Sequence, residues 1–335
     1  MSVLITGGTG FIGSHTVVEI QQQGYDAVVL DNLSNSKKEV VDRIERITGK
    51  KITFYRTDLL DREGLGSIFR FHKFSSVIHF AAAKVLGASI SQPLSYYRNN
   101  VEGSINLIEM MEEFGVKNLV FSSTAAVYAE EEESPLTEES QCRAETPYGR
   151  TKLITEDIIK DVHNSEKGLN AVILRYFNPI GAHPSGLIGE EPPKNPDNLM
   201  PYVGKAAAGE IPYVTVYGND YDTIDGTGVR DFIHIVDLAR GHINALEKLQ
   251  SDGGIHTYNL GCGRGCSVLE VIKAYEKVSG KKIEYRFAGR RAGDLACVYA
   301  NPSKAERELN WKAEKKLEDM CRDHWNWMRE SRSVD

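Results

Sequence analysis

The stretch Thr6-Gly7-Gly8-Thr9-Gly10-Phe11-Ile12-Gly13 follows a short apolar run at residues 3–6 and opens a segment with helical periodicity at about residues 11–23. Three glycines of the stretch have separate physical tasks. Gly7 permits a tight turn, Gly10 lets backbone N–H groups approach a pyrophosphate, and Gly13 lets the helix pack closely against the strand. A pyrophosphate held there lies at the positive end of the helix. The stretch therefore predicts a dinucleotide-binding loop, with a bare structural turn as the alternative for the glycines alone.

An acidic residue follows this loop at the expected place. Apolar residues 27–30 predict a second strand, and Asp31 ends it. A carboxylate at this position can bind the ribose hydroxyls of the adenosine and repels the additional phosphate of NADP, so we expect the cofactor to be NAD. Asp58, which follows a third predicted strand, suits the adenine end. The alternative for Asp58 is a turn or a helix N-cap.

The first half of the chain alternates short apolar runs with helix-period segments. These runs are continuous, which indicates strands buried on both faces of a parallel sheet. We therefore expect an α/β protein with a Rossmann-type doubly wound parallel sheet and a smaller C-terminal α/β substrate domain. The strands are predicted at residues 3–6, 27–30, 52–55, 77–80 and 119–121.

The domain organisation is expected to be discontinuous. An NAD-binding domain is predicted over residues 1–176 with a returning segment at about 232–260. A second, substrate-binding domain is predicted over about 177–231 and 261–335. Residues 177–232 are rich in Pro, Gly and Asn, so we expect a weakly structured functional loop region there.

The composition excludes some classes of protein. The chain has 335 residues, 41% of them hydrophobic and 26% charged, with a formal net charge of -7, which gives no electrostatic footprint for nucleic acid. The five cysteines form no C-x-x-C pair and no zinc-site spacing, so no metal is expected, and unpaired cysteines fit a reducing compartment. The sequence shows no secretory signal pattern and no apolar run long enough to span a bilayer. We expect a cytoplasmic protein with no membrane partner.

Two residues four positions apart, Tyr148 and Lys152, carry the predicted chemistry. At this spacing they share one helix face. A free tyrosine has a pKa of about 10, and a nearby lysine cation favours its phenolate. Tyr148 could then act as a general base beside a nicotinamide ring. A surface helix pair is the alternative when the Tyr-x-x-x-Lys pattern is taken alone.

The run Ser122-Ser123-Thr124 supports the catalytic interpretation. It follows the apolar run at 119–121, and the carboxyl ends of parallel strands are where ligands bind in such sheets. A hydroxyl at this place can share the proton of a sugar OH group with Tyr148.

Over its whole length the chain resembles the UDP-glucose 4-epimerase family of the extended short-chain dehydrogenases/reductases. The matching segments are TGGTGFIGSH (6–15), DNLSNS (31–36), VIHFAA (77–82), NNV (99–101), FSST (121–124), PYGRTK (147–152), RYFNPIGAHPSG (175–186), DNLMPY (197–202), YGNDY (217–221), DGTGVRDFIH (225–234) and YNLG (258–261). Segments of this length, in order along the chain, are far more specific than a single short motif.

The resemblance implies a role for individual residues. The implied catalytic residues are Thr124, Tyr148 and Lys152. The implied NAD contacts are Gly7, Gly10, Phe11, Ile12, Gly13, Asp31, Asn32, Asn35, Ser36, Asp58, Leu59, Phe80, Ala81, Ala82, Lys84, Asn99, Ser122, Tyr148, Lys152 and Phe177. The implied UDP-sugar contacts are Lys84, Thr124, Tyr148, Asn178, Asn198, Leu199, Thr215, Val216, Tyr217, Arg230, Arg291, Asp294 and Val298.

The implied activity is the NAD-dependent, reversible epimerisation of UDP-glucose and UDP-galactose at C4 through a 4-keto intermediate. Arg230 and Arg291 suit the two phosphates because guanidinium is a planar, permanently charged group. Val298 stands where the family has either a bulky tyrosine or a smaller residue that leaves room for an N-acetyl group. We therefore also expect turnover of UDP-GlcNAc and UDP-GalNAc.

Three alternatives remain at this point. The chain could be another UDP-sugar 4-epimerase, acting on an N-acetylhexosamine or a pentose. It could be a nucleotide-sugar dehydratase, although Ala125-Ala126 follow Thr124 where dehydratases of this superfamily carry an Asp-Glu pair. It could be a non-catalytic NAD-binding sensor, although such proteins typically lose the Tyr/Lys pair.

The resemblance also implies a homodimer. Residues 93–115 and 148–163 are predicted to form long helices with apolar stripes, which in this family pair across a two-fold axis as a four-helix bundle. The alternative is that both stripes simply face the sheet.

Overall fold

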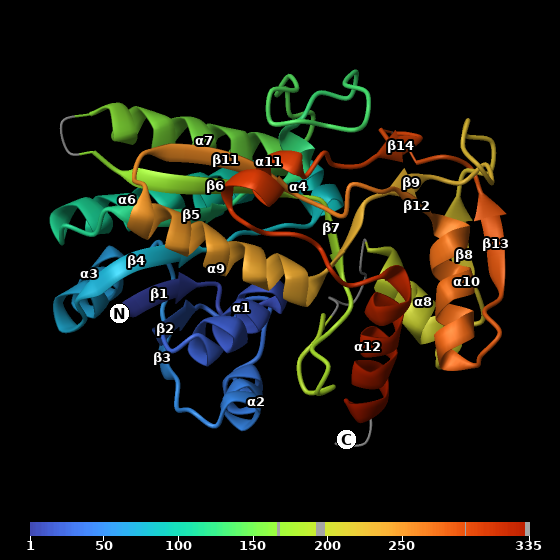
Figure 1. Cartoon of the computed structure of the whole chain (residues 1–335), viewed down its shortest axis with the longest axis horizontal. Coiled ribbons are helices and arrows are strands. Elements are labelled where there is room, and N and C mark those ends of the chain that lie inside the picture. Colours follow the sequence, from blue (N-terminus) through green and yellow to red (C-terminus); the bar gives the residue numbers. More distant parts are fainter. Residues whose placement is uncertain (166–167, 192–197, 292, 332–335) are drawn as a thin grey trace.

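A parallel sheet forms the centre of the molecule (Figure 1). The computed structural model describes residues 1–165, 168–191, 198–291 and 293–331, and in this part of the chain the sheet has seven strands in the order β11-β6-β5-β4-β1-β2-β3. All neighbouring strands pair in parallel. The strands are β1 (Ser2–Thr6), β2 (Asp26–Asp31), β3 (Thr53–Arg56), β4 (Phe74–His79), β5 (Asn118–Ser122), β6 (Asn170–Tyr176) and β11 (Ile255–Leu260).

Helices cover both faces of this sheet, which confirms the doubly wound prediction. Val3 and Ile5 pack into one hydrophobic core and Leu4 into a second, so β1 is buried on both sides. The first core includes side chains of α1 (Phe11–Gln22), α2 (Glu39–Thr48) and α9 (Ile235–Ser251). The second core includes side chains of α3 (Arg62–Phe71), α6 (Gly103–Glu113) and α7 (Pro147–Asn164). In both figures α6 and α7 lie side by side.

The chain between β4 and β5 is helical with an interruption. It contains α4 (Leu86–Ser91), α5 (Pro93–Tyr96) and a π-helix at Tyr97–Glu102 that leads into α6. A short 3-10 helix, Ala125–Val127, follows β5. The π-helix is relevant below because such insertions occur frequently at functional sites.

Smaller elements make up the rest of the described chain, and apart from α11 (Ser303–Glu308), which contacts β11, they lie to the right of the sheet in Figure 1. β7 pairs with β10, β12-β9-β14 form a three-stranded sheet, and β13 pairs with β8. These elements are β7 (Asn178–Ile180), α8 (Leu199–Ala207), β8 (Val214–Tyr217), β9 (Val229–Arg230), β10 (Phe232–His234), β12 (Cys266–Ser267), α10 (Val268–Ser279), β13 (Tyr285–Ala288), β14 (Cys297–Val298), α11 (Ser303–Glu308) and α12 (Leu317–Glu330).

The prediction of a weakly structured region at 177–232 was wrong for its described part, which contains α8 and strands β7, β8 and β9. Met200 and Val203 of α8 pack in a third hydrophobic core with Val271 of α10 and Met320 of α12. The sequence did not reveal these short elements, because Gly and Pro separate their apolar residues. The strands and helices against which they pack also lie far away in the sequence. Residues 192–197 of this region, including Asp197 of the DNLMPY segment, lie outside the described residues.

Two further observations bear on the class of protein. In the described part of the chain, none of the helices combines the length and the apolar character needed to cross a bilayer. The five cysteines, Cys142, Cys262, Cys266, Cys297 and Cys321, are free.

Candidate active site

The glycine loop lies between β1 and α1, at the carboxyl edge of the sheet where the strand order departs in two directions from β1. A Cβ atom at Gly7, whose φ is +70°, would lie 2.7 Å from the backbone nitrogen of Ala81. A Cβ atom at Gly13 would lie 2.2 Å from the carbonyl oxygen of Gly7. Both positions therefore require glycine. Gly10 is the N-cap of α1 and has no side chain that could bond to the first N–H groups of the helix. The helix N-terminus therefore fits a pyrophosphate.

The Asp31 carboxylate is buried and held in place at the end of β2. Oδ1 accepts hydrogen bonds from the Leu33 backbone N–H at 2.9 Å and from Ser36 Oγ at 3.1 Å, and Oδ2 accepts one from the Thr9 backbone N–H at 3.2 Å. Thr9 belongs to the glycine loop, so the acid and the loop are one structural unit. A carboxylate offers about four lone-pair positions, which leaves acceptor capacity for ribose hydroxyls.

Asp58 takes the alternative role in a turn and also contacts Asn32. One oxygen accepts from the Leu60 backbone N–H at 2.9 Å, as in an Asx turn. The other accepts from Asn32 Nδ2 at 2.8 Å, and this contact orients Asn32, another predicted NAD residue. Asp58 is not a helix N-cap, because Asp61 caps α3.

The predicted catalytic residues meet where the first turn of α7 lies over the end of β5. Thr146 caps α7, its hydroxyl accepting from the Gly149 N–H at 3.1 Å, which places Tyr148 in the first turn. Lys152 Nζ donates to the carbonyl oxygen of Ser122 at 2.7 Å. The Thr124 side chain lies beside Tyr148 and lowers the pKa of its phenol. The structure thus brings together Thr124, Tyr148 and Lys152.

Burial dominates the titration of this pair. It raises the pKa of Tyr148 well above the usual value, with the neighbouring Tyr176 adding to the effect and the Thr124 side chain opposing it. Burial also lowers the pKa of Lys152 to about 7, against the opposing charge of Glu156. The prediction that Lys152 lowers the pKa of Tyr148 is therefore wrong for the protein groups alone. Desolvation disfavours both the Tyr148 phenolate and the charged ammonium group of Lys152.

The predicted phosphate-binding arginines occupy the C-terminal part. Arg230 Nη1 donates to the carbonyl oxygens of Val229 at 2.9 Å and Leu295 at 2.8 Å, and Nη2 lies 3.5 Å from Asp294 Oδ1. The Arg291 guanidinium lies 4.1 Å from the centre of the Tyr217 ring. These predicted residues form an exposed or half-buried group that can exchange its contacts for those of a ligand.

Other predicted substrate residues differ in what they can offer. Val216 is 1% exposed and packs in the third core, because side chains of β8 alternate between the core and the surface. Only its backbone can meet a ligand, whereas Thr215 and Tyr217 point the other way. Val298 pairs with Arg230 in the sheet register and packs in one cluster with Phe177.

The remaining predicted residues lie on loops and strand ends around the sheet edge. Asn178 begins β7, and Leu199 begins α8 after Asn198. Phe80, Ala81 and Ala82 follow β4, Asn99 lies in the π-helix, and Leu59, Asn35 and Ser36 lie on loops after β3 and β2.

Asn100 is a structural organiser that the sequence analysis passed over. Its side chain accepts from the Ala83 backbone N–H at 2.8 Å and donates to the Ala83 carbonyl at 3.0 Å and to Thr151 Oγ1 at 2.9 Å. It thereby ties the loop after β4 to α7, and Asn99 donates to it at 2.8 Å. The signal was the Asn-Asn pair itself, since asparagine is unfavourable inside helices.

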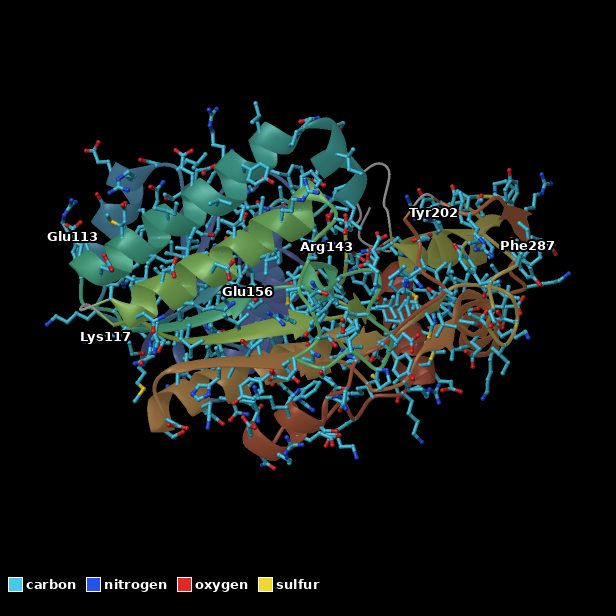
Figure 2. The ribbon with its side chains drawn as sticks, turned by 90° about the horizontal axis from the view of Figure 1, so that it is seen from above. Glu113, Lys117, Arg143, Glu156, Tyr202 and Phe287 are labelled. Atoms are coloured by element: carbon cyan, nitrogen blue, oxygen red, sulfur yellow. The ribbon has the colours of Figure 1, made fainter. Side chains whose placement is uncertain are left out.

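A buried ion pair also escaped the sequence analysis. Glu156 on α7, labelled in Figure 2, accepts two hydrogen bonds from Arg175 of β6, at 3.1 and 2.6 Å, and one from Ser123 Oγ at 2.5 Å. Burial opposes the charge on Arg175, but Glu156 outweighs it and raises the pKa of the guanidinium. Glu156 lies one turn from Lys152, so this pair anchors the catalytic helix to the sheet.

Comparison with known proteins identifies the family of the chain. The model of the NAD dependent epimerase/dehydratase family matches residues 3–261, and the chain belongs to that family. Within it, the chain is 55% identical over 327 residues to a UDP-glucose 4-epimerase of Bacillus subtilis, with 98% of this chain and 96% of that protein covered.

Solved structures give the same result. The UDP-glucose 4-epimerase from Stenotrophomonas maltophila, with bound NAD and formylated UDP-arabinopyranose, is similar at a TM-score of 0.98 and 48% identity, covering 100% of both chains. The UDP-glucose 4-epimerase from Bifidobacterium longum, in complex with NAD+ and UDP, is similar at a TM-score of 0.95 and 47% identity, also covering 100% of both chains.

Proposed function

We propose that this enzyme interconverts UDP-glucose and UDP-galactose by NAD-dependent epimerisation at C4. The observation that carries the proposal is the docking of the first turns of α7 on the end of β5, where Lys152 Nζ donates to the Ser122 carbonyl oxygen, on the same sheet edge as the glycine loop and Asp31. The similarity to UDP-glucose 4-epimerases over the whole chain supports it.

NAD, when bound, supplies a hydride acceptor and donor for C4 of the sugar. We assign its pyrophosphate to the glycine loop and its adenosine ribose to Asp31, whose carboxylate is already aligned by Thr9 and Ser36. A Cβ atom at Gly7 or Gly13 would collide with protein backbone, so these two glycines fix the shape of the loop that would hold the pyrophosphate.

Tyr148, as the phenolate and with Thr124 beside it, would take the proton of the sugar 4-OH, become the phenol, and return that proton when C4 is reduced again. The protein groups keep Tyr148 a phenol and Lys152 close to half-neutral at pH 7, since the pKa of Lys152 is about 7. A positive charge beside Tyr148, such as that of an oxidised nicotinamide ring, favours the phenolate. The Tyr148 base would therefore form only once the cofactor is bound. Lys152 remains fixed by the Ser122 carbonyl during this transfer.

The sugar nucleotide is assigned to the C-terminal part, with its diphosphate on Arg230 and Arg291. Guanidinium groups bind phosphate with paired hydrogen bonds, and those of Arg230 and Arg291 are accessible. Strong contacts at the UDP end and few at the hexose would hold the nucleotide while the 4-keto sugar rotates to present its opposite face.

The size of Val298 supports activity on the N-acetylated sugars UDP-GlcNAc and UDP-GalNAc. Its side chain is half-buried and packs with Phe177. A tyrosine here would fill space that valine leaves open. Turnover of UDP-GalNAc at a rate comparable with UDP-galactose is expected; undetectable turnover of the acetylated pair would exclude this extension.

We also propose the assembly and location of the enzyme. The domain division is residues 1–176 with about 232–260, and about 177–231 with 261–335. β11 supports it by joining the central sheet, and α9 by packing in the hydrophobic core beside that sheet. Exposed Leu94, Ile105 and Ile154 support a homodimer through a four-helix bundle of the α5–α6 and α7 regions. The free cysteines support a cytoplasmic location.

Incubation of the purified enzyme with UDP-galactose tests the function. Formation of UDP-glucose with unchanged mass is expected, because epimerisation neither adds nor removes atoms. Loss of water would instead show a dehydratase, for which Ala125 and Ala126 offer no proton-transferring group. Denaturation should release one NAD per chain, and absence of both turnover and NAD would reject the proposal.

A further inference from the structure

Glu190, in the segment between β7 and α8, joins two residues assigned to the sugar nucleotide. Its Oε1 atom accepts a hydrogen bond from Lys84 Nζ at 3.0 Å and another from Asn198 Nδ2 at 2.9 Å. Lys84 lies in the loop after β4, whereas Asn198 caps the start of α8. A single oxygen atom therefore ties a donor of the NAD-binding part to a donor of the C-terminal part.

The exposure of the two charged side chains argues against a purely stabilising role. The Glu190 side chain is only 7% exposed, but that of Lys84 is 42% exposed. An ion pair with so accessible a cation adds little to folding stability, since water screens it. The consequence of the contact is instead the position of the Lys84 ammonium group.

Asn198 gives a second, independent argument. Asparagine is a favoured N-cap because its side-chain oxygen accepts from the first N–H groups of a helix. Asn198 is the N-cap of α8 and makes no such bond. Its amide faces Glu190, and because a carboxylate only accepts, the amide nitrogen is the atom held there. The chain thus gives up a stabilising cap to orient this side chain.

We propose that Glu190 is a positioning residue that aims Lys84 and Asn198 at the sugar nucleotide as one unit. The inference rests on the proposed function, which assigns both residues to that ligand. Paired with Glu190, Lys84 contributes no net charge. The pair therefore suits hydroxyl groups of the substrate, whereas the diphosphate is left to Arg230 and Arg291.

The test compares Glu190→Gln with Glu191→Gln in the full-length, NAD-loaded enzyme. Glu191 is the matched control because it is the adjacent acid, and it pairs instead with Lys37 at 2.8 Å and Arg43 at 3.1 Å. We expect Glu190→Gln to lower kcat/KM for UDP-galactose about tenfold, the size of a lost charged hydrogen bond. Glu191→Gln should stay within about twofold. Equal kcat/KM values for the two variants would overturn the proposal.

A double-mutant cycle separates positioning from stability. If Glu190 acts through Lys84, the double variant Lys84→Met/Glu190→Gln loses less kcat/KM than the product of the two single losses. Losses that multiply would show independent action and overturn the proposal. So would a Glu190→Gln enzyme whose only defects are a lower Tm and a lower NAD content, with normal kcat/KM per loaded site.

The affinity of the same variants for UDP-galactose, measured by calorimetry, repeats the comparison with binding in place of kcat/KM. A wild-type chain that binds UDP-galactose but does not epimerise it would reject the proposed function, while the binding cycle would still decide the role of Glu190. The two failures are therefore distinguishable.

Discussion

The catalytic end and the nucleotide end of the proposed active site are built in opposite ways. At the catalytic end, Tyr148 is 8% and Lys152 4% exposed, and burial shifts the pKa of both. At the nucleotide end, Arg230 is half-buried, Arg291 is exposed, and each cation rests on a replaceable protein partner. The difference indicates a division of labour. The catalytic end depends on single atoms held without water, whereas the nucleotide end can exchange contacts at little cost.

Replacing Tyr148 by Phe tests the catalytic end most severely. The change removes one oxygen and leaves the ring in place, so we expect kcat to fall about 10³-fold, within the range of general acid–base catalysis. Binding of UDP, measured by calorimetry, should stay within about twofold, because the nucleotide end makes its own contacts. Unchanged turnover would exclude Tyr148 as the base, and equal loss of UDP binding would show that the two ends are not separable.

The same contrast explains what the sequence could predict. The glycine loop, Asp31 and the strand-ending hydroxyls were predictable because each depends on local spacing along one strand–turn–helix unit. Glu190 and Glu156 were not, since their partners come from other elements, 106 positions away for Lys84 and 19 for Arg175. The π-helix that carries Asn99 was missed for a related reason, because a one-residue insertion leaves the apolar period almost unchanged.

Replacing Glu156 by Gln tests whether the catalytic helix depends on its buried anchor. The variant leaves the Arg175 guanidinium, whose side chain is 5% exposed, without its carboxylate. Breaking a buried pair in this way costs about 3–5 kcal/mol of unfolding free energy. Urea unfolding measures it. Glu131→Gln, which removes an exposed partner of Arg143, is the control and should leave stability unchanged. A small loss in Glu156→Gln would mean that the anchor is not needed.

Replacing Arg230 by Lys tests the nucleotide end. Lysine cannot hold the carbonyl oxygens of Val229 and Leu295 and present a planar pair of donors to phosphate at the same time. We expect KM for UDP-galactose to rise about tenfold with kcat nearly unchanged, as for the loss of contacts made equally in ground and transition states. Arg290→Lys is the matched control, because the guanidinium of Arg290 pairs with Asp220 at 2.9 Å. A fall in kcat alone would place Arg230 in the chemical step.

Lys152 is also expected to impose a pH dependence on the stability of the folded protein. Burial lowers the pKa of Lys152 from 10.5 to about 7, so between these values the unfolded chain holds a proton that the folded protein has released. Unfolding free energy therefore rises with pH above about 7, by at most about 1.4 kcal/mol for each pH unit.

Lys152→Met should remove the increase of unfolding free energy with pH above pH 7. It should keep the increase that occurs at lower pH. That lower rise comes from histidines whose pKa burial lowers to about 3, such as His15 and His324, because they too bind protons only when unfolded. Urea unfolding of both proteins between pH 5 and 9 makes the comparison. A slope above pH 7 that survives in Lys152→Met would mean that Lys152 stays charged in the folded protein. In that case the catalytic end would resemble the nucleotide end, where the cations remain charged beside their partners.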